Sequence, residues 1–90
     1  PVSLSTEFNI LLESLLIYPN PTNGSFTVQV AQEFLEGEFT VVNGLGQVVK
    51  NLVVSQTNTP INIMGMATGL YIVKVKKGNK TQSTKLVISN

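Results

Sequence analysis

The chain is 90 residues long, 42% hydrophobic and only 12% charged, with a formal net charge of +1. This length allows one small domain, which must pack efficiently because small domains hide only about 60% of their unfolded surface. The sequence contains no His, Cys, Asp, Arg or Trp. It therefore lacks the groups on which most catalytic mechanisms, zinc sites and calcium loops depend, and we expect no active site, no metal and no cofactor.

The charges are distributed unevenly along the chain. The five acidic residues are glutamates in the first half, whereas the six lysines lie in the second half, mostly between Lys74 and Lys85. These lysines form either a docking face for an anionic partner or, as is commoner, a solvated strand face that protects a sheet edge. Because arginine is absent, nucleic acid is a poor candidate partner.

The N-terminal part differs from the rest of the chain in its pattern of polar and apolar residues. No apolar run reaches the roughly 18 residues that span a bilayer, and no signal-peptide pattern is present. Because the chain begins with Pro1 and not with Met, we expect it to be the C-terminal piece of a longer protein. Residues 1–14 mix polar residues with leucines at spacings that fit a helical stripe or a linker equally, so we expect a linker or short N-terminal segment there.

A rigid corner follows the hydrophobic run 15–18, which we expect to be a strand. Pro19 and Pro21 each fix φ near about −65° and donate no hydrogen bond, and Asn20 is pushed toward extended geometry because it precedes a proline. Asn23 and Gly24 then form a pair that tolerates positive φ and lets the chain reverse. The segment cannot be helical.

Short alternating stretches separated by turn residues fill the remainder of the chain. We expect strands starting at residue 25, at 38–43, at 47–54, in a short run from Pro60, at 70–77 and at 81–89, with a polar loop over 55–59. The side chains expected to point inward are Phe26, Val28, Val30, Phe39, Val41, Tyr71, Val73, Val75, Leu86 and Ile88. With no convincing helix after residue 18, the pattern predicts an all-β fold, an immunoglobulin-like antiparallel β-sandwich of about seven short strands.

Four motifs in a fixed order resemble a known family. They are the run from Ile17 to Pro21, the turn at Gly46-Gln47-Val48, the stretch from Gly69 to Val75, and a closing Lys85-Leu86-Val87-Ile88. Together they resemble the type A C-terminal sorting domain of type IX secretion cargo in Bacteroidetes, over residues 15 to 90. One departure is that Asn43 stands where the family usually has Asp; it can make the same turn bond without charge.

The resemblance implies a non-catalytic secretion-signal domain fused to an N-terminal cargo. It implies recognition by the type IX outer-membrane translocon and by shuttle or sortase proteins, with passage through the periplasm to the cell surface or the exterior. A sortase would remove the domain while the cargo is attached or released. We expect a monomer, with residues 1–14 as the cleavable linker and 15–90 as the sorting domain.

Two groups of residues carry the expected roles. The residues expected to shape turns or the core are Pro19, Asn20, Pro21, Gly24, Gly46, Gly69 and Tyr71. The candidates for translocon recognition are Lys85, Leu86, Val87 and Ile88, in a terminal edge strand that could add to the sheet of a partner.

Two other classes of function remain open from the residues alone. A carbohydrate-binding accessory module of a glycoside hydrolase would have the same fold, but such modules stack sugars on exposed Trp or Tyr, and this chain has no Trp and two Tyr. A pilin-like adhesive domain would require self-association.

Overall fold

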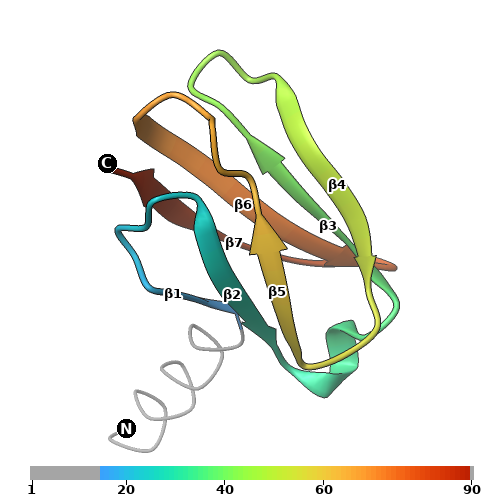
Figure 1. The fold of residues 1–90 in the computed structure, drawn as a ribbon. Coiled ribbons are helices and arrows are strands. Elements are labelled where there is room, and N and C mark those ends of the chain that lie inside the picture. The colour runs from blue at the N-terminus through green and yellow to red at the C-terminus, as the bar shows by residue number, and fades with distance from the viewer. Residues whose placement is uncertain (1–14, 90) are drawn as a thin grey trace, which may run out of the picture.

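The structure is a computed structural model that describes residues 15–89, so the prediction for residues 1–14 lies outside the described residues. Seven strands follow one another along the chain (Figure 1). Their bounds are β1 Leu15–Tyr18, β2 Ser25–Val30, β3 Gly37–Val42, β4 Val48–Val54, β5 Asn58–Asn62, β6 Gly69–Lys77 and β7 Lys80–Ile88. A single 3-10 turn, η1 Gln32–Phe34, is the one helical element among the described residues.

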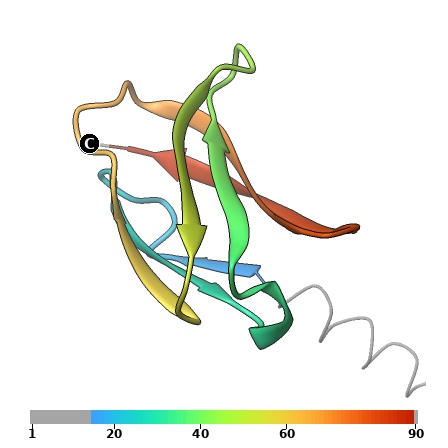
Figure 2. The same ribbon diagram turned by 90° about the vertical axis from the view of Figure 1, so that its right-hand side faces the viewer.

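The strands form two antiparallel sheets. One sheet has the order β1-β2-β5 and the other has the order β4-β3-β6-β7. Figure 2 shows the two layers facing each other, with β1, β2 and β5 in one and β3, β4, β6 and β7 in the other. The predicted immunoglobulin-like β-sandwich is therefore confirmed.

The core lies between the sheets and follows the period of two in the sequence. On β2, Phe26, Val28 and Val30 are buried while the residues between them face outward, as the pleat of a strand requires. All the side chains predicted to point inward are buried. The remaining core members are Leu15, Phe34, Val54, Ile61 and Ile63.

Several strand ends differ from the sequence prediction by one or two residues, and two of the differences have a clear structural reason. Thr59, expected in a polar loop, lies in β5, because β5 continues its pairing with β2 back to Asn58. Gly37, expected in a turn, starts β3 instead, and the chain reverses at Glu36, which has a φ of 70°. Phe34 of the unpredicted turn η1 is 1% exposed, so this turn closes one end of the core.

Pro60 lies where its missing N–H does least harm. It pairs with Thr27 within β5, which is an edge strand of its sheet. This placement agrees with the rule that proline within a sheet is confined to edge strands, bulges or the first residue of a strand. Among residues 15–89 the structure contains no helix long and apolar enough to cross a bilayer.

Gly24 is the glycine whose replacement we expect to cost most. Its φ is 117°, and a Cβ there would lie 2.8 Å from the Cα of Met64. We expect Gly24→Ala to lower the free energy of unfolding in urea by about 2 kcal/mol or more, because backbone strain and a backbone clash add. Gly46→Ala is the control: its φ is 85° but a Cβ would meet nothing within 4 Å. A cost at Gly24 no larger than the one at Gly46 would contradict this account.

Candidate functional site

The Pro-Asn-Pro corner crosses from β1 in one sheet to the outer edge of β7 in the other. Both peptide bonds that precede its prolines, Tyr18-Pro19 and Asn20-Pro21, are cis. The side chain of Asn20 reaches the main chain of β7: its Nδ2 donates to the carbonyl of Lys85 at 2.9 Å, and its Oδ1 accepts from the N–H of Val87 at 3.0 Å. The carboxamide thus serves one acceptor and one donor of the same edge.

Thr22 continues this attachment with its backbone. Its N–H donates to the carbonyl of Val87 at 2.9 Å, and its carbonyl accepts from the N–H of Ser89 at 2.8 Å. The result is a parallel bridge between Thr22 and Ile88. The Thr22 hydroxyl is also bonded, since Oγ1 donates to the carbonyl of Ser25 at 2.8 Å and accepts from the N–H of Gly24 at 3.1 Å. Thr22 is 3% exposed, so it is a buried anchor for the corner.

These contacts limit where a partner strand could add to the last strand. The outward main-chain groups of β7 from the Lys85 carbonyl to the Ser89 N–H are already bonded to the corner. A partner strand cannot add there while the corner is in place. In addition, the side chains of Leu86 and Ile88 lie in the core, with exposures of 0% and 2%. Of the four candidate residues, only Lys85 and Val87 present side chains to solvent.

The turn at residues 43–47 is built around the side chain of Asn43. Its Oδ1 accepts from the N–H groups of Leu45 at 2.9 Å and Gln47 at 3.0 Å. Gly46 takes a φ of 85° in this turn, and its N–H donates to the carbonyl of Asn43 at 3.0 Å. An amide oxygen is sufficient for these bonds, so the turn does not need the negative charge of an aspartate.

Tyr71 fixes the loop that leads into β6. The ring is 5% exposed, and the hydroxyl donates to the carbonyl of Ala67 at 2.6 Å. Gly69, at the start of the strand, has a φ of 148°. Both residues therefore shape the loop between β5 and β6. This loop lies at the opposite end of β6 from the β6–β7 hairpin, which carries Lys76, Lys77 and Lys80.

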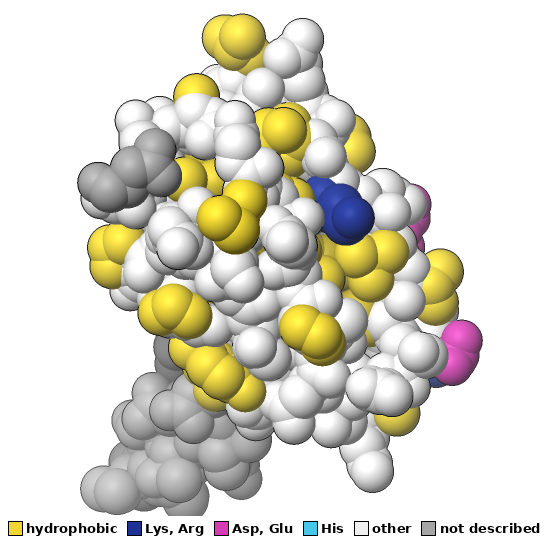
Figure 3. All heavy atoms as spheres, viewed as in Figure 1, with side chains coloured by type: hydrophobic (Ala, Val, Ile, Leu, Met, Phe, Trp, Pro, Cys, Tyr) yellow, Lys and Arg dark blue, Asp and Glu magenta, His cyan; other side chains and the backbone are white. Residues whose placement is uncertain are grey.

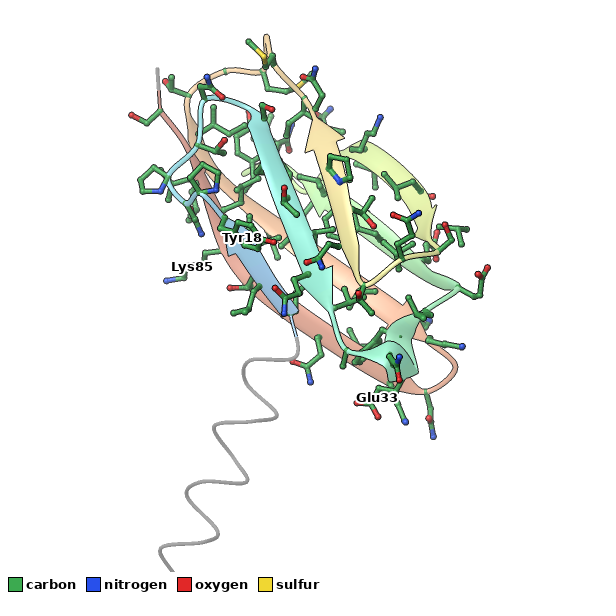
Figure 4. All side chains as sticks on the ribbon, turned by 60° about the horizontal axis from the view of Figure 1, so that its bottom comes forward. Tyr18, Glu33 and Lys85 are labelled. Atoms are coloured by element: carbon green, nitrogen blue, oxygen red, sulfur yellow. The ribbon has the colours of Figure 1, made fainter. Side chains whose placement is uncertain are left out.

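The lysines do not form a single patch. The Lys80 Nζ lies 3.1 Å from a carboxylate oxygen of Glu33, and the Lys77 Nζ donates to the carbonyl of Leu35 at 2.5 Å, so both reach toward η1. Figure 4 shows Glu33 at that end of the sandwich and Lys85 at its margin beside β1. Lys74, Lys76 and Lys85 lie on the outer face of the four-stranded sheet.

The outer face of the three-stranded sheet is nearly uncharged. In Figure 3 the visible face carries separate hydrophobic side chains, with a lysine side chain to the right of the centre and acidic side chains at the right-hand margin. Tyr18 is 46% exposed on this face, and its hydroxyl donates to the Oδ1 of Asn58 at 3.2 Å. Within residues 15–89, no three His, Cys, Asp or Glu side chains gather in a way that could hold a metal ion.

We expect Thr22→Val to destabilise the domain by about 1 to 3 kcal/mol in urea unfolding, because the similar shape of valine removes the hydroxyl and leaves two backbone groups without their partner. Thr27→Val on the exposed side of β2 is the matched control and should change stability by less than about 0.5 kcal/mol. Equal effects of the two substitutions would contradict the anchoring role of Thr22.

The family model for the secretion-system C-terminal sorting domain matches residues 16–89. Beta-agarase A of Zobellia galactanivorans is 33% identical over 72 residues, which cover 80% of this chain and 13% of the agarase. The chain therefore spans only a small part of this relative.

A solved structure of Porphyromonas gingivalis PorZ, described as an essential bacterial surface component of the type-IX secretion system, has the same fold. The likeness has a TM-score of 0.75 at 18% identity and covers 88% of this chain and 12% of that chain. Because the family model extends over nearly the whole described sandwich, from β1 to the residue after β7, the chain belongs to the family of type IX (Por) secretion-system C-terminal sorting domains.

Proposed function

We propose that this domain is a non-catalytic secretion signal that directs a fused N-terminal cargo across the outer membrane through the type IX machinery. The observation that carries the proposal is the family match over residues 16–89, which coincides with one folded unit closed by hydrogen bonds between its first turn and its last strand. A signal that has to be recognised on many cargoes benefits from folding independently of them.

The route and partners follow from the same proposal. The cargo lies on the N-terminal side of the linker, and residues 1–14 belong to that linker, in which a sortase cuts before the cargo is attached to the surface or released. The domain passes through the periplasm as a monomer and meets the outer-membrane translocon with its shuttle or sortase proteins. Within the domain, residues 15–90 are sufficient for recognition.

The side chains proposed to contact the translocon are Lys85 and Val87. Both are exposed on the outer face of β7, and each lies opposite an apolar residue of β6: Lys85 pairs with Ile72, and Val87 pairs with Leu70. Leu70 is 50% exposed. Together these residues offer a small apolar surface beside one positive charge.

No specific observation favours the carbohydrate-binding alternative. Tyr71 is buried, and the exposed ring of Tyr18 has its hydroxyl bonded to Asn58. The agarase relative is matched over only 13% of its length, so its name describes a protein that is mostly outside the match.

The export claim is tested with a reporter protein that carries its own signal peptide and is fused to residues 15–90. In a bacterium with a working type IX system, we expect the fusion on the surface or in the medium, whereas the reporter alone stays in the periplasm. Fractionation and immunoblotting measure the distribution. The proposal fails if the fusion stays in the periplasm although the domain is folded, or if it leaves equally well when the translocon gene is deleted.

The recognition claim is tested with substitutions that leave the core intact, because removing the last strand would also remove Leu86 and Ile88 from it. We expect the double variant Lys85→Glu and Val87→Asp to reduce export at least about tenfold, since a reversed charge and a buried carboxylate oppose binding. Lys50→Glu with Val53→Asp makes the same chemical changes on β4, the opposite edge strand of this sheet, and should export normally. Similar export of the two double variants, at similar unfolding midpoints, would contradict the role of Lys85 and Val87.

A further inference from the structure

The corner and β7 form the beginning of a parallel ladder. In a parallel pair, a residue bonds to the neighbours on either side of the residue opposite it, and Thr22 does this with the Val87 carbonyl and the Ser89 N–H. Two residues earlier in such a ladder, the backbone of residue 20 would bond to the Lys85 carbonyl and the Val87 N–H. The carboxamide of Asn20 bonds to these same two groups, so the side chain takes the place of the N–H and C=O of one strand residue.

The ladder stops there, although the edge of β7 continues. Alternate residues of a strand direct their main-chain groups to the same edge, so Thr81, Ser83 and Lys85 share the edge that Val87 uses. The groups next in line are the Lys85 N–H and the Ser83 carbonyl, followed by the Ser83 N–H and the Thr81 carbonyl. Within residues 15–89, none of these four groups has a hydrogen-bond partner. The corner bonds the carbonyl of Lys85 but not its N–H.

A hollow lies beside this open stretch. It has a volume of about 540 Å³ and is lined by Asn20, Ile72, Ser83, Thr84 and Lys85. The Asn20 side chain therefore borders the same hollow as Ser83, Thr84 and Lys85 of β7. In Figure 4 the side chain of Lys85 projects from this margin of the sandwich.

We propose that the edge of β7 from Thr81 to Lys85 binds an extended, acidic polypeptide segment that runs parallel to β7 and ends against Asn20. We choose the parallel direction because it continues the ladder that Thr22 and Asn20 begin at this edge. The inference deepens the proposed function, on which it rests for its biological meaning, by naming the chemistry of a partner at the last strand.

The acidic character of the segment follows from the charges around the edge. Lys85 lies on β7 itself, and the β6 residues opposite Ser83 and Thr81 are Lys74 and Lys76. The one acidic residue in register with these on the outer face is Glu38, next to Lys76. Alternate side chains of an added strand would face this surface, so carboxylates at those positions gain attraction and lysines are repelled.

The test uses the 90-residue chain and a blocked five-residue peptide of alternating glutamate and valine, followed by amide NMR. At millimolar peptide we expect saturable shifts at the amides of Ser83 and Lys85 that weaken with added salt. The matching lysine and valine peptide should bind at least about tenfold more weakly. Lys85→Glu should weaken the glutamate peptide by a similar factor, whereas Lys50→Glu on β4 should not.

A second variant examines the role of Asn20 directly. Asn20→Ala should extend the peptide-induced shifts to the Val87 amide and speed hydrogen exchange at that amide about tenfold, because two bonds of the corner are lost. Asn23→Ala, three residues along the chain, should leave exchange at Val87 unchanged.

Shifts that map to another surface, equal binding of the two peptides, or no binding at millimolar concentrations would overturn the inference. Unchanged exchange at Val87 in Asn20→Ala would overturn the strand-mimic role of Asn20. Because the binding test needs no secretion, normal export without peptide binding would remove this inference alone, and peptide binding without export would remove the proposed function alone.

Discussion

The hydrogen bonds between the Pro-Asn-Pro corner and β7 are the constraint on which the closed sandwich depends. β1 belongs to one sheet and β7 to the other, so without these bonds the first and last strands would meet only through side chains. Thr22 supplies a buried backbone bridge, and Asn20 supplies an exposed side-chain bridge. The corner thus protects the C-terminal part of an edge that would otherwise be a template for unwanted strand pairing.

The fold could be predicted from the sequence because its strongest signals are local. The alternation in 25–30 and 70–77 reflects one buried face on each strand, and that period survives whatever the strands pack against. The predicted element boundaries are wrong where pairing with a distant strand, and not local composition, determines the structure. Asn58 and Thr59 have the composition of a polar loop, but they form a strand because they pair with β2. The turn η1 is fixed by the burial of Phe34, and no Gly, Pro, Asn or Asp within it indicates a turn.

The candidate site, in contrast, depends on long-range contacts that the local sequence does not indicate. The residues that form the corner could be identified from Pro19, Asn20 and Pro21, but not what they contact, because Asn20 and Val87 are 67 positions apart. A threonine between a proline and an asparagine looks like an exposed turn residue, and its burial depends on a strand at the far end of the chain. Position along the sequence indicated a free last strand, whereas the structure shows that the edge of its C-terminal part is bonded to the corner.

The same long-range bonds bear on when the domain can form. The contacts from Asn20 to Lys85 and Val87 span 65 and 67 residues, so closing them encloses almost the entire sandwich in one loop. A growing chain can build β2 with β5, and β3 with β4, before β7 exists, but the corner has nothing to bond until the last strand has been made. Such non-local pairing forms late and slowly. A polypeptide carrying this domain therefore completes the folded sorting domain only after β7 and everything that precedes it have been synthesised.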